Sequence, residues 1–339
     1  MRKIRMKDKS SLEISYGKLA KIIDNNNDFL IITHVFPDGD ALGSLTALHN
    51  FLLKLGKNSK MLCKSTLPYQ YKFLPGFSDI KKDISQIGQG DKKFVCICID
   101  CADEKRIDQD FDAIRSNISC IINIDHHRSN TCFGDIDIVD SQKSATAEIL
   151  YGFISDRYRS LLDYNIAISI YVGILTDTGR FQYSNTTANV HKITSELLKF
   201  GILPSEVYGH IYESDPVERF KLIQMVLGRI RYTRSLSLIY SYVLNSDFKK
   251  LKIPFYSQDG IIDLLRTAGG AKVVALIKQI DNNSYKVSLR SSDLEIDLSG
   301  IAAKFGGGGH RSASAYSDKG NLRTVMARLE KTINDSMVQ

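Results

Sequence analysis

The sequence predicts an α/β protein of two domains, the first built on a parallel sheet and the second smaller. Short apolar runs alternate with helical patterns through residues 29–200, which is typical of parallel α/β sheets. Consecutive helical segments follow around Pro204, and strand patterns return from Ser235. A chain of 339 residues is long enough to give each domain its own core. The predicted parts are a domain at 1–204, a helical connector at 205–234 and a second α/β domain at 235–339.

Three strands of the first domain are expected to be buried on both faces of the sheet. Their apolar runs show no polar alternation, as is usual for parallel strands that are covered on both sides. A helix should follow the first strand over 40–55, because leucines recur there on one face and Gly56 ends the pattern. The strands are expected at 29–33, 94–99 and 119–124, and further helices at 144–154, 164–175 and 187–200.

The connector and the second domain show different patterns. Helical segments with no strand between them run over roughly 205–232, and strands and helices then alternate again. A glycine-rich loop at 306–309 follows the last helix of this part. The strands are expected at 236–243, 272–278 and 285–290, and the helices near 260–267 and 299–305.

Composition and charge indicate a cytoplasmic protein with an anionic ligand. The basic N-terminus MRKIRMKDKS is followed by no apolar stretch of signal-peptide length. The apolar run 166–175 is far shorter than the roughly 20 residues that span a bilayer. The net charge of +7 comes from scattered lysines and arginines, which favours an anionic ligand without a long nucleic-acid groove or a membrane as partner. An ordinary basic surface would explain the same charge.

The six cysteines are expected to be reduced thiols, mostly buried. Four of them lie in or beside apolar runs such as FVCICIDC and ISCIINI, in a chain without an export signal. Cys96 and Cys98 would point to the same side of a buried strand. The C-x-C-x-x-C spacing is therefore interpreted as packing rather than as a soft-metal site.

Polar and ionisable side chains follow each of the three predicted strands. Because the carboxyl ends of parallel strands line the crevice where open α/β sheets bind ligands, these side chains should lie close together. Pro37 prevents a helix directly after the first strand, so the next residues form a loop. A further acid, Asp177, ends the apolar run of a later helix. The side chains at the strand ends are His34, Asp38, Asp40, Asp100, Asp125, His126 and His127.

Four aspartates in one crevice would repel one another, and burial would drive some of them to protonate. Two divalent cations carry four positive charges and would balance the four negative charges of Asp38, Asp40, Asp100 and Asp177. Oxygen ligands mixed with imidazole suit manganese, with magnesium and cobalt as alternatives. Paired metals about 3.5–4 Å apart are the arrangement that catalyses phosphoryl transfer. A single acid after a strand is usually only a turn or cap residue, so the prediction depends on all four acids together.

The motifs resemble those of a known family. THVFPDGDALGS, the strand end at Asp100, Asp125-His126-His127 and TDTG resemble the four motifs of the DHH phosphoesterases. SLRSS and FGGGGH near the C-terminus resemble the domain associated with one branch of that family. The resemblance implies that one metal is bound by His34, Asp38 and Asp100, and the second by Asp40, Asp100, His126 and Asp177. It also implies that Asp125 orients the metal-binding histidine, and that His127 contacts the scissile phosphate and protonates the leaving oxygen.

The glycine run of the second domain is interpreted as an anion clamp for the end of a short ligand. Glycines allow backbone N–H groups to approach an anion closely, and charged side chains nearby can add donors. The alternatives are a flexible hinge at the glycines and an ordinary surface arginine. The residues assigned to substrate binding are Arg290, Gly306, Gly307, Gly308, Gly309 and His310.

Within the family, the chain resembles the nano-RNase/pAp-phosphatase group. That group hydrolyses very short oligoribonucleotides to nucleoside 5′-monophosphates and converts 3′-phosphoadenosine 5′-phosphate (pAp) to AMP. A cyclic di-AMP or pApA phosphodiesterase is the first alternative, and a non-catalytic nucleotide sensor is a more distant one. Two other activities of the family fit the sequence less well. An inorganic pyrophosphatase would carry a basic Arg-Lys-Lys type motif in its second domain, and this sequence shows none. A single-strand exonuclease would ordinarily be longer than this chain. Oligomeric state, including a homodimer, stays open at this point.

Overall fold

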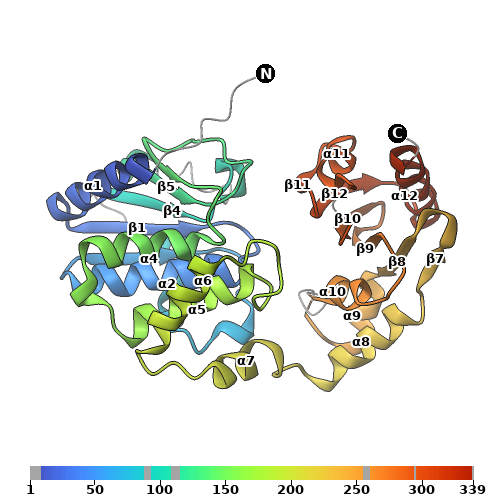
Figure 1. The fold of residues 1–339 in the computed structure, drawn as a ribbon, viewed down its shortest axis with the longest axis horizontal. Coiled ribbons are helices and arrows are strands. Elements are labelled where there is room, and N and C mark those ends of the chain that lie inside the picture. Colours follow the sequence, from blue (N-terminus) through green and yellow to red (C-terminus); the bar gives the residue numbers. More distant parts are fainter. Residues whose placement is uncertain (1–8, 88–92, 108–114, 255–259, 294, 338–339) are drawn as a thin grey trace. The chain divides into compact units, whose positions relative to one another are not determined.

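The computed structural model describes residues 9–87, 93–107, 115–254, 260–293 and 295–337. The chain forms two compact units, Met1–Ser214 and Asp215–Gln339, called the first and the second unit below (Figure 1). The boundary between them lies inside the segment 205–234 that was predicted as a connector. Each unit has its own apolar core.

The first unit contains a six-stranded sheet in which all neighbouring strands are parallel, as the sequence predicted. The strand order is β3-β2-β1-β4-β5-β6, so the direction of winding reverses between β1 and β4. Open sheets of this type bind ligands at that reversal, beyond the carboxyl ends of the strands. The strands are β1 (Asp28–Thr33), β2 (Asn58–Leu62), β3 (Ile80–Lys81), β4 (Phe94–Ile99), β5 (Ile118–Asp125) and β6 (Ile136–Val139).

Both faces of this sheet are buried, which confirms the interpretation of the continuous apolar runs. Phe29 and Ile31 of β1 contribute to the large core beneath the helices, whereas Leu30 and Ile32 contribute to a separate cluster on the opposite face. Helices α2, α4 and α5 lie along one side of the sheet in Figure 1. The helices are α1 (Lys9–Asn25), α2 (Gly39–Lys54), α4 (Thr146–Arg157), α5 (Tyr164–Asp177), α6 (Ala188–Leu198) and α7 (Pro204–Tyr212).

Helices α2 and α5 pack unusually closely, because glycines lie where they meet. A Cβ atom on Gly43 would lie 2.5 Å from the carbonyl oxygen of Ser169. A Cβ atom on Gly173 would lie 2.5 Å from the Cβ of Ala147 and 2.7 Å from the Oδ1 atom of Asp40. The glycines therefore let α5 approach the start of α2, where two of the predicted metal ligands lie.

The second unit is a smaller α/β domain with a mixed six-stranded sheet, as expected. The strand order is β11-β12-β10-β9-β8-β7; β8 and β9 are parallel, and the other neighbours are antiparallel. One face packs against α8, α9 and α10 and the other against α11 and α12. The strands are β7 (Arg231–Thr233), β8 (Leu238–Val243), β9 (Val273–Asp281), β10 (Ser284–Ser291), β11 (Gly308–His310) and β12 (Ala313–Lys319). The helices are α8 (Val217–Leu227), α9 (Asn245–Leu251), α10 (Ile261–Arg266), α11 (Leu298–Ala303) and α12 (Leu322–Met337).

The sequence analysis did not predict β12, α9 or α12, and two further details of the second unit differ from it. Strand β7 lies at the end of the segment that was predicted to be entirely helical, and it pairs with β8. The glycine run is only partly a loop, because Gly308 and Gly309 belong to β11 and pair with β12. Backbone pairing with a neighbouring strand, which a glycine-rich sequence does not reveal, explains the second difference.

Short 3-10 helices occur at Tyr69–Tyr71, Phe77–Asp79, Ile84–Ile87, Glu104–Arg106, Arg115–Asn117, Arg159–Leu161 and Arg234–Leu236.

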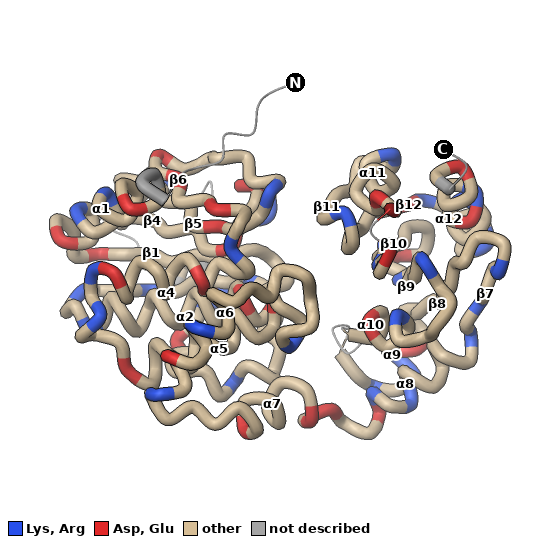
Figure 2. Tube along the Cα trace, viewed as in Figure 1, with Lys and Arg blue, Asp and Glu red and all other residues tan. Residues whose placement is uncertain are grey.

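Charged residues and cysteines of the described part of the chain are distributed as the sequence analysis expected. Basic and acidic residues are interspersed along the trace of each unit in Figure 2. Cys63, Cys96, Cys98 and Cys101 are buried, whereas Cys120 is partly exposed and Cys132 is exposed. Among the helices that the structure describes, none combines the length and the apolar character needed to cross a bilayer.

Candidate metal centre

The predicted ligands of the first unit meet at the reversal point of the sheet. Their nitrogen and oxygen atoms form three overlapping groups, and within each group the atoms lie within 4.8 Å of one another. Each group combines carboxylate oxygens with imidazole nitrogens, the donor set expected for a divalent transition metal. The groups are His34, Asp38 and Asp100; Asp40, His126 and Asp177; and Asp100, His126 and His127.

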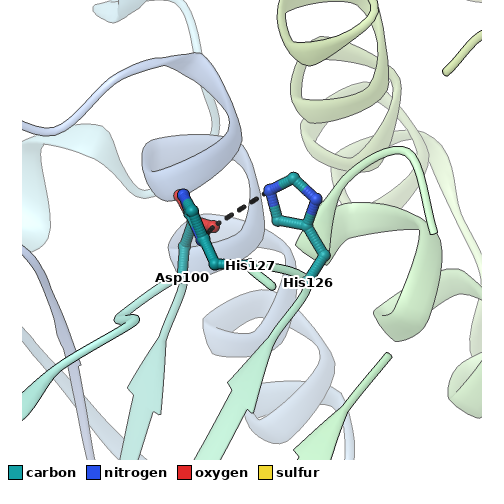
Figure 3. Close-up of side chains that lie close together, drawn as sticks. All are labelled: Asp100, His126 and His127. Carbon is teal, nitrogen blue, oxygen red and sulfur yellow. Dashed lines mark ion pairs between the residues drawn. The ribbon is translucent and has the colours of Figure 1, made fainter. Parts of the chain in front are cut away.

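Asp100 is the centre of this arrangement. Its carboxylate lies 3.5 Å from the Nε2 atom of His34, 3.7 Å from that of His126 and 3.6 Å from the Nδ1 atom of His127. Figure 3 shows Asp100 at the end of one strand, with His126 and His127 following the neighbouring strand. Burial alone would raise the pKa of Asp100, but the hydrogen bond from His34 and the charges of His127 and His126 outweigh it and lower the pKa. Asp100 is therefore an anion that faces three imidazoles.

The backbone at Asp100 has a conformation that few residues adopt. Its φ of 59° lies in the left-handed region, where aspartate and asparagine are enriched among the residues other than glycine. The backbone N–H of Asp100 donates to the carbonyl oxygen of Ile124 on β5, at 3.0 Å. This conformation at the end of β4 coincides with a carboxylate that contacts groups from both neighbouring strands. Such backbone strain is found preferentially at functional sites.

The loop between β1 and α2 presents two carboxylates in different ways. Asp38 caps α2, because its Oδ1 atom accepts hydrogen bonds from the backbone N–H groups of Asp40 and Ala41. Asp40 instead faces the start of α4, where its carboxylate accepts from the backbone N–H groups of Thr146 at 2.6 Å and Ala147 at 3.0 Å. A helix N-terminus stabilises negative charge. Asp40 lies in the first turn of α2, but the N–H groups that bind its carboxylate belong to the start of α4.

Buried negative charge nevertheless exceeds the positive charge that the protein supplies here. Burial and the neighbouring charge of Asp100 raise the pKa of Asp40 to about 7, although His126 and the N-terminus of α4 lower it. Burial also raises the pKa of Asp177 well above its ordinary value. In the part of the chain that the structure describes, the ion pairs of Asp40, Asp100 and Asp177 are with histidines and not with lysine or arginine. Divalent cations would remove this deficit, so the donor set fits bound metal.

His126 lies between the carboxylates of α2, β4 and α5. Its Nε2 atom is 3.3 Å from the Oδ2 atom of Asp177 and 3.9 Å from that of Asp40. Burial alone would lower the pKa of His126, but Asp177, Asp100 and Asp40 raise it to about 9. Without a metal, this imidazole is thus protonated at neutral pH, and a proton occupies the position where a cation is expected.

The role given to Asp125 by the family resemblance needs a correction. Asp125 was expected to orient the metal-binding histidine, His126. In the structure its Oδ1 atom lies 2.7 Å from the Nδ1 atom of His127, whereas the Nδ1 atom of His126 faces the carbonyl oxygen of Lys143 at 3.4 Å. Residues two apart at the end of a strand project to the same side, which explains why Asp125 contacts His127. Asp125 is itself held by the side-chain amide of Asn130, at 2.6 Å.

Thr146 is a site residue that the sequence analysis missed. Its backbone N–H donates to Asp40, and its Oγ1 hydroxyl donates to the Oδ1 atom of Asp100 at 2.9 Å. A single buried threonine therefore positions a carboxylate from α2 and one from β4. The only signal in the sequence was its place at the start of a predicted helix.

Replacing Thr146 by valine is expected to weaken metal binding by about 10–100-fold, the usual effect of removing a partner of a metal ligand. Valine keeps the size and the backbone N–H of threonine but removes the hydroxyl that holds Asp100. Thr146→Ser should retain most of the affinity. Titration calorimetry with Mn²⁺ measures the effect, and the melting temperature in EDTA shows whether the fold is intact. Equal affinity of the valine variant and the unchanged protein would contradict this role.

The structure also brings together the predicted binding residues of the second unit. Arg290 of β10 pairs with Ala313 of β12, which pairs with His310 of β11. Residues opposite one another in antiparallel strands project to the same face, so Arg290 and His310 lie on one face, two strands or about 10 Å apart. On that face the Nε atom of Arg290 lies 3.8 Å from Asp263 of α10.

The four positions of the glycine run differ in whether, and why, the structure requires glycine there. Gly306 has a φ of 71° just after α11, a conformation that commonly ends helices. Gly307 and Gly309 lie against β12, since an added Cβ would be 2.3 Å and 2.5 Å from carbonyl oxygens of that strand. At Gly308 a Cβ would meet no atom within 4 Å, and the backbone does not require glycine. Backbone conformation therefore explains Gly306, and packing explains Gly307 and Gly309, but Gly308 is left unexplained.

Each of the two units matches a known protein family model. The family model described as "DHH family, N-terminal domain" matches residues 28–174, and the model described as "DHHA1 domain" matches residues 237–335. A Thermus thermophilus protein named "Bifunctional oligoribonuclease and PAP phosphatase NrnA" is 30% identical over 311 residues, which cover 91% of this chain and 90% of that protein. The chain belongs to the DHH family.

Solved structures support the same classification of this DHH-family chain. An exopolyphosphatase-related protein from Bacteroides fragilis superposes with a TM-score of 0.86 at 26% identity and covers 95% of this chain and 96% of its own. RecJ from Thermus thermophilus in complex with Mn²⁺ has a TM-score of 0.52 at 10% identity and covers 97% of this chain and 55% of its own. The latter likeness is one of fold alone. The resemblance stated from the motifs is thereby confirmed at the level of family and fold.

Proposed function

We propose that this DHH-family chain is a two-metal phosphoesterase, with manganese as the metal, that acts in the cytoplasm on very short nucleotides. It hydrolyses short oligoribonucleotides to nucleoside 5′-monophosphates and removes the 3′-phosphate of pAp. The observation that carries this proposal is the convergence of carboxylates and imidazoles at the reversal point of the parallel sheet. Relatives named as oligoribonuclease and PAP phosphatase, which match over most of the chain, support the substrate class.

We assign the metal ligands from the two groups of donor atoms that hold most of the carboxylates. His34, Asp38 and Asp100 form one site, and Asp40, Asp100, His126 and Asp177 form the other. The supporting evidence is the spacing of the donor atoms and the unbalanced negative charge described above. Bound divalent cations would neutralise a substrate phosphate and make attack by water easier at neutral pH.

His127 supplies the proton for the leaving oxygen in this proposal. Its Nδ1 atom is bound to Asp125, which fixes the orientation of the ring. Burial alone would lower the pKa of His127, but the hydrogen bond to Asp125 and the charge of Asp100 raise it above its ordinary value. The raised pKa favours the protonated imidazole, and the side chain is partly exposed, as a general acid must be.

The second unit, which the DHHA1 domain model matches, is called the DHHA1 unit from here on, and the first unit is called the DHH unit. The DHHA1 unit binds the part of the nucleotide that is not cleaved. Arg290 and His310 on one face can contact an anionic group, and Gly308 allows the backbone to approach it. The absence of a steric reason for Gly308 supports this interpretation, because contact with a ligand would be the remaining reason for a glycine there.

A product assay tests the proposed function directly. Purified protein with Mn²⁺ would be incubated separately with pAp, pApA, cyclic di-AMP, a five-residue RNA and pyrophosphate. The expected result is AMP from pAp and nucleoside 5′-monophosphates from the short RNA, with loss of both activities in EDTA. Release of phosphate from pyrophosphate alone, or hydrolysis of none of the five, would refute the proposal.

His310→Ala is expected to reduce hydrolysis of a dinucleotide strongly while sparing a small chromogenic phosphodiester. The small substrate has no distal group for the DHHA1 unit to bind, so it depends on the metal centre alone. Gly308→Ala should act in the same direction without loss of stability, because the added methyl group meets no protein atom. Steady-state kinetics on both substrates measure the difference.

A matched control is Arg323→Ala, which removes an exposed cation from α12 on the opposite face of the second sheet. It should leave both activities unchanged. Equal losses on the dinucleotide and on the small phosphodiester in His310→Ala would argue against a clamp.

A further inference from the structure

An exposed aromatic ring lies in the loop that carries the first metal ligands. Phe36 is between His34 and Asp38 in the loop from β1 to α2, and 79% of its surface is exposed. Successive Cα atoms are 3.8 Å apart, so the Cα atom of Phe36 lies within about 7.6 Å of those of both ligands. The backbone of Phe36 is thus close to that of two metal ligands, and its exposed ring contributes little to the core.

The backbone of Phe36 is in a conformation that suits this residue poorly. Its φ is 58°, in the left-handed region where a bulky side chain is a clear outlier. Pro37 follows, and a residue before proline normally has an extended backbone with negative φ. Phe36 therefore departs from two backbone preferences at once.

Backbone contacts hold this conformation, and they do not depend on the ring. The N–H of Phe36 donates to the Oγ atom of Ser65 at 2.9 Å, and the N–H of Val35 donates to the carbonyl oxygen of Arg106 at 2.9 Å. Asp38 fixes the far end of the loop by capping α2. If the loop only had to place the two ligands, glycine or asparagine would adopt the same φ more easily. Neither the backbone nor core packing explains a phenylalanine at this position.

We propose that the ring of Phe36 is a stacking surface for the base of the bound nucleotide, which makes Phe36 a substrate-binding residue of the DHH unit. This inference rests on the proposed nucleotide phosphoesterase function. Bases stack on exposed aromatic rings with little dependence on sequence, because every base has a π face. An exposed ring in the loop that carries two metal ligands would retain nucleotides and discriminate against phosphate esters that lack a base. The backbone contacts of the loop fix the position from which the ring projects before the substrate binds.

The test compares substrates with and without bases in matched variants. Phe36→Asn removes the ring but keeps a residue that tolerates positive φ, and Phe36→Trp keeps a stacking surface. The substrates are pApA and the same dinucleotide with both bases replaced by hydrogen. Loss of one stacked base predicts a fall in kcat/KM of about 5–150-fold for Phe36→Asn on pApA. The abasic dinucleotide should be hydrolysed at the same rate by all three proteins.

The control variant is Tyr164→Ala, which removes an exposed ring from the first residue of α5. It lies at the other end of this 14-residue helix from Asp177, about 20 Å away. Unchanged kinetics of Phe36→Asn on pApA, or equal losses on both substrates, would overturn the inference. If the unmodified protein hydrolyses neither substrate, the proposed function fails instead. The melting temperature with Mn²⁺ checks that each variant is folded.

Discussion

Asp100→Asn is expected to lower kcat by more than about 100-fold. A loss of roughly 100-fold is the most that usually follows when a residue that hydrogen-bonds a metal ligand is removed, and Asp100 is proposed to be a ligand itself. Asp100 belongs to two of the three donor groups and faces His34, His126 and His127. Asparagine has nearly the same shape but no charge, so both proposed metal sites would lose a shared anionic ligand. Calorimetric titration with Mn²⁺ should show weaker binding at both sites, and kinetics with pAp should show the loss of turnover.

The substitution should change the chemistry without unfolding the chain. Asparagine, like aspartate, tolerates the positive φ at this position. A matched control is Asp103→Asn in the same loop, because in the described part of the chain the carboxylate of Asp103 caps a short 3-10 helix through the N–H of Lys105. The control should have unchanged activity. If Asp100→Asn bound two equivalents of Mn²⁺ with undiminished affinity, the shared role of Asp100 would be wrong.

The parallel sheet was predictable from the sequence because burial on both faces leaves a clear pattern. β1 and β4 are largely apolar runs that are followed directly by His34 and Asp100 of the site, and the buried half of β5 ends at Asp125. The edge strands β3 and β6 and the strand β2 next to β3 were missed. They are short and partly exposed and each contains a polar residue, so they pair through backbone groups that no side-chain pattern reveals.

The grouping of the site residues could also be predicted, because strand ends of a parallel sheet meet at one edge. The hydrogen bonds among these residues could not. Nothing in the spacing shows that Asp40 faces the N-terminus of α4, or that Thr146 connects it to Asp100. Both contacts depend on the close approach of α2, α4 and α5, which Gly173 permits. Asp125 likewise contacts His127 because of the side to which the chain projects after β5, and motif matching does not contain that information.

The stabilisation of the fold by Mn²⁺ is expected to increase as the pH rises from about 6 to about 9. In the metal-free protein the pKa of Asp40 is raised from 3.8 to about 7, chiefly by burial. The pKa of His126 is raised from 6.5 to about 9, because three carboxylates outweigh the opposite effect of burial. The folded chain therefore keeps protons that the unfolded chain releases, between pH 3.8 and 7 at Asp40 and between pH 6.5 and 9 at His126.

The sign of the effect follows from this difference in bound protons. Where the folded state binds more protons than the unfolded state, the free energy of unfolding falls as the pH rises, so metal-free protein loses stability through these windows. A cation that replaces the same protons binds more tightly as they leave, and stabilises the fold according to its affinity. The difference in melting temperature between Mn²⁺ and EDTA should therefore be larger at pH 8.5 than at pH 6.

Calorimetry in buffers of different ionisation enthalpy should detect protons released on metal binding, and the number released should fall toward pH 9. Asp40→Asn provides the matched comparison, because it removes the carboxyl group that holds one of these protons but leaves His126 in place. Its metal-free form should lose less stability than the unmodified protein between pH 4 and 7. A metal-dependent shift in melting temperature that is constant from pH 6 to 9 would mean that protons do not occupy the positions of the cations. The charge deficit in the crevice would then have another explanation than bound metal.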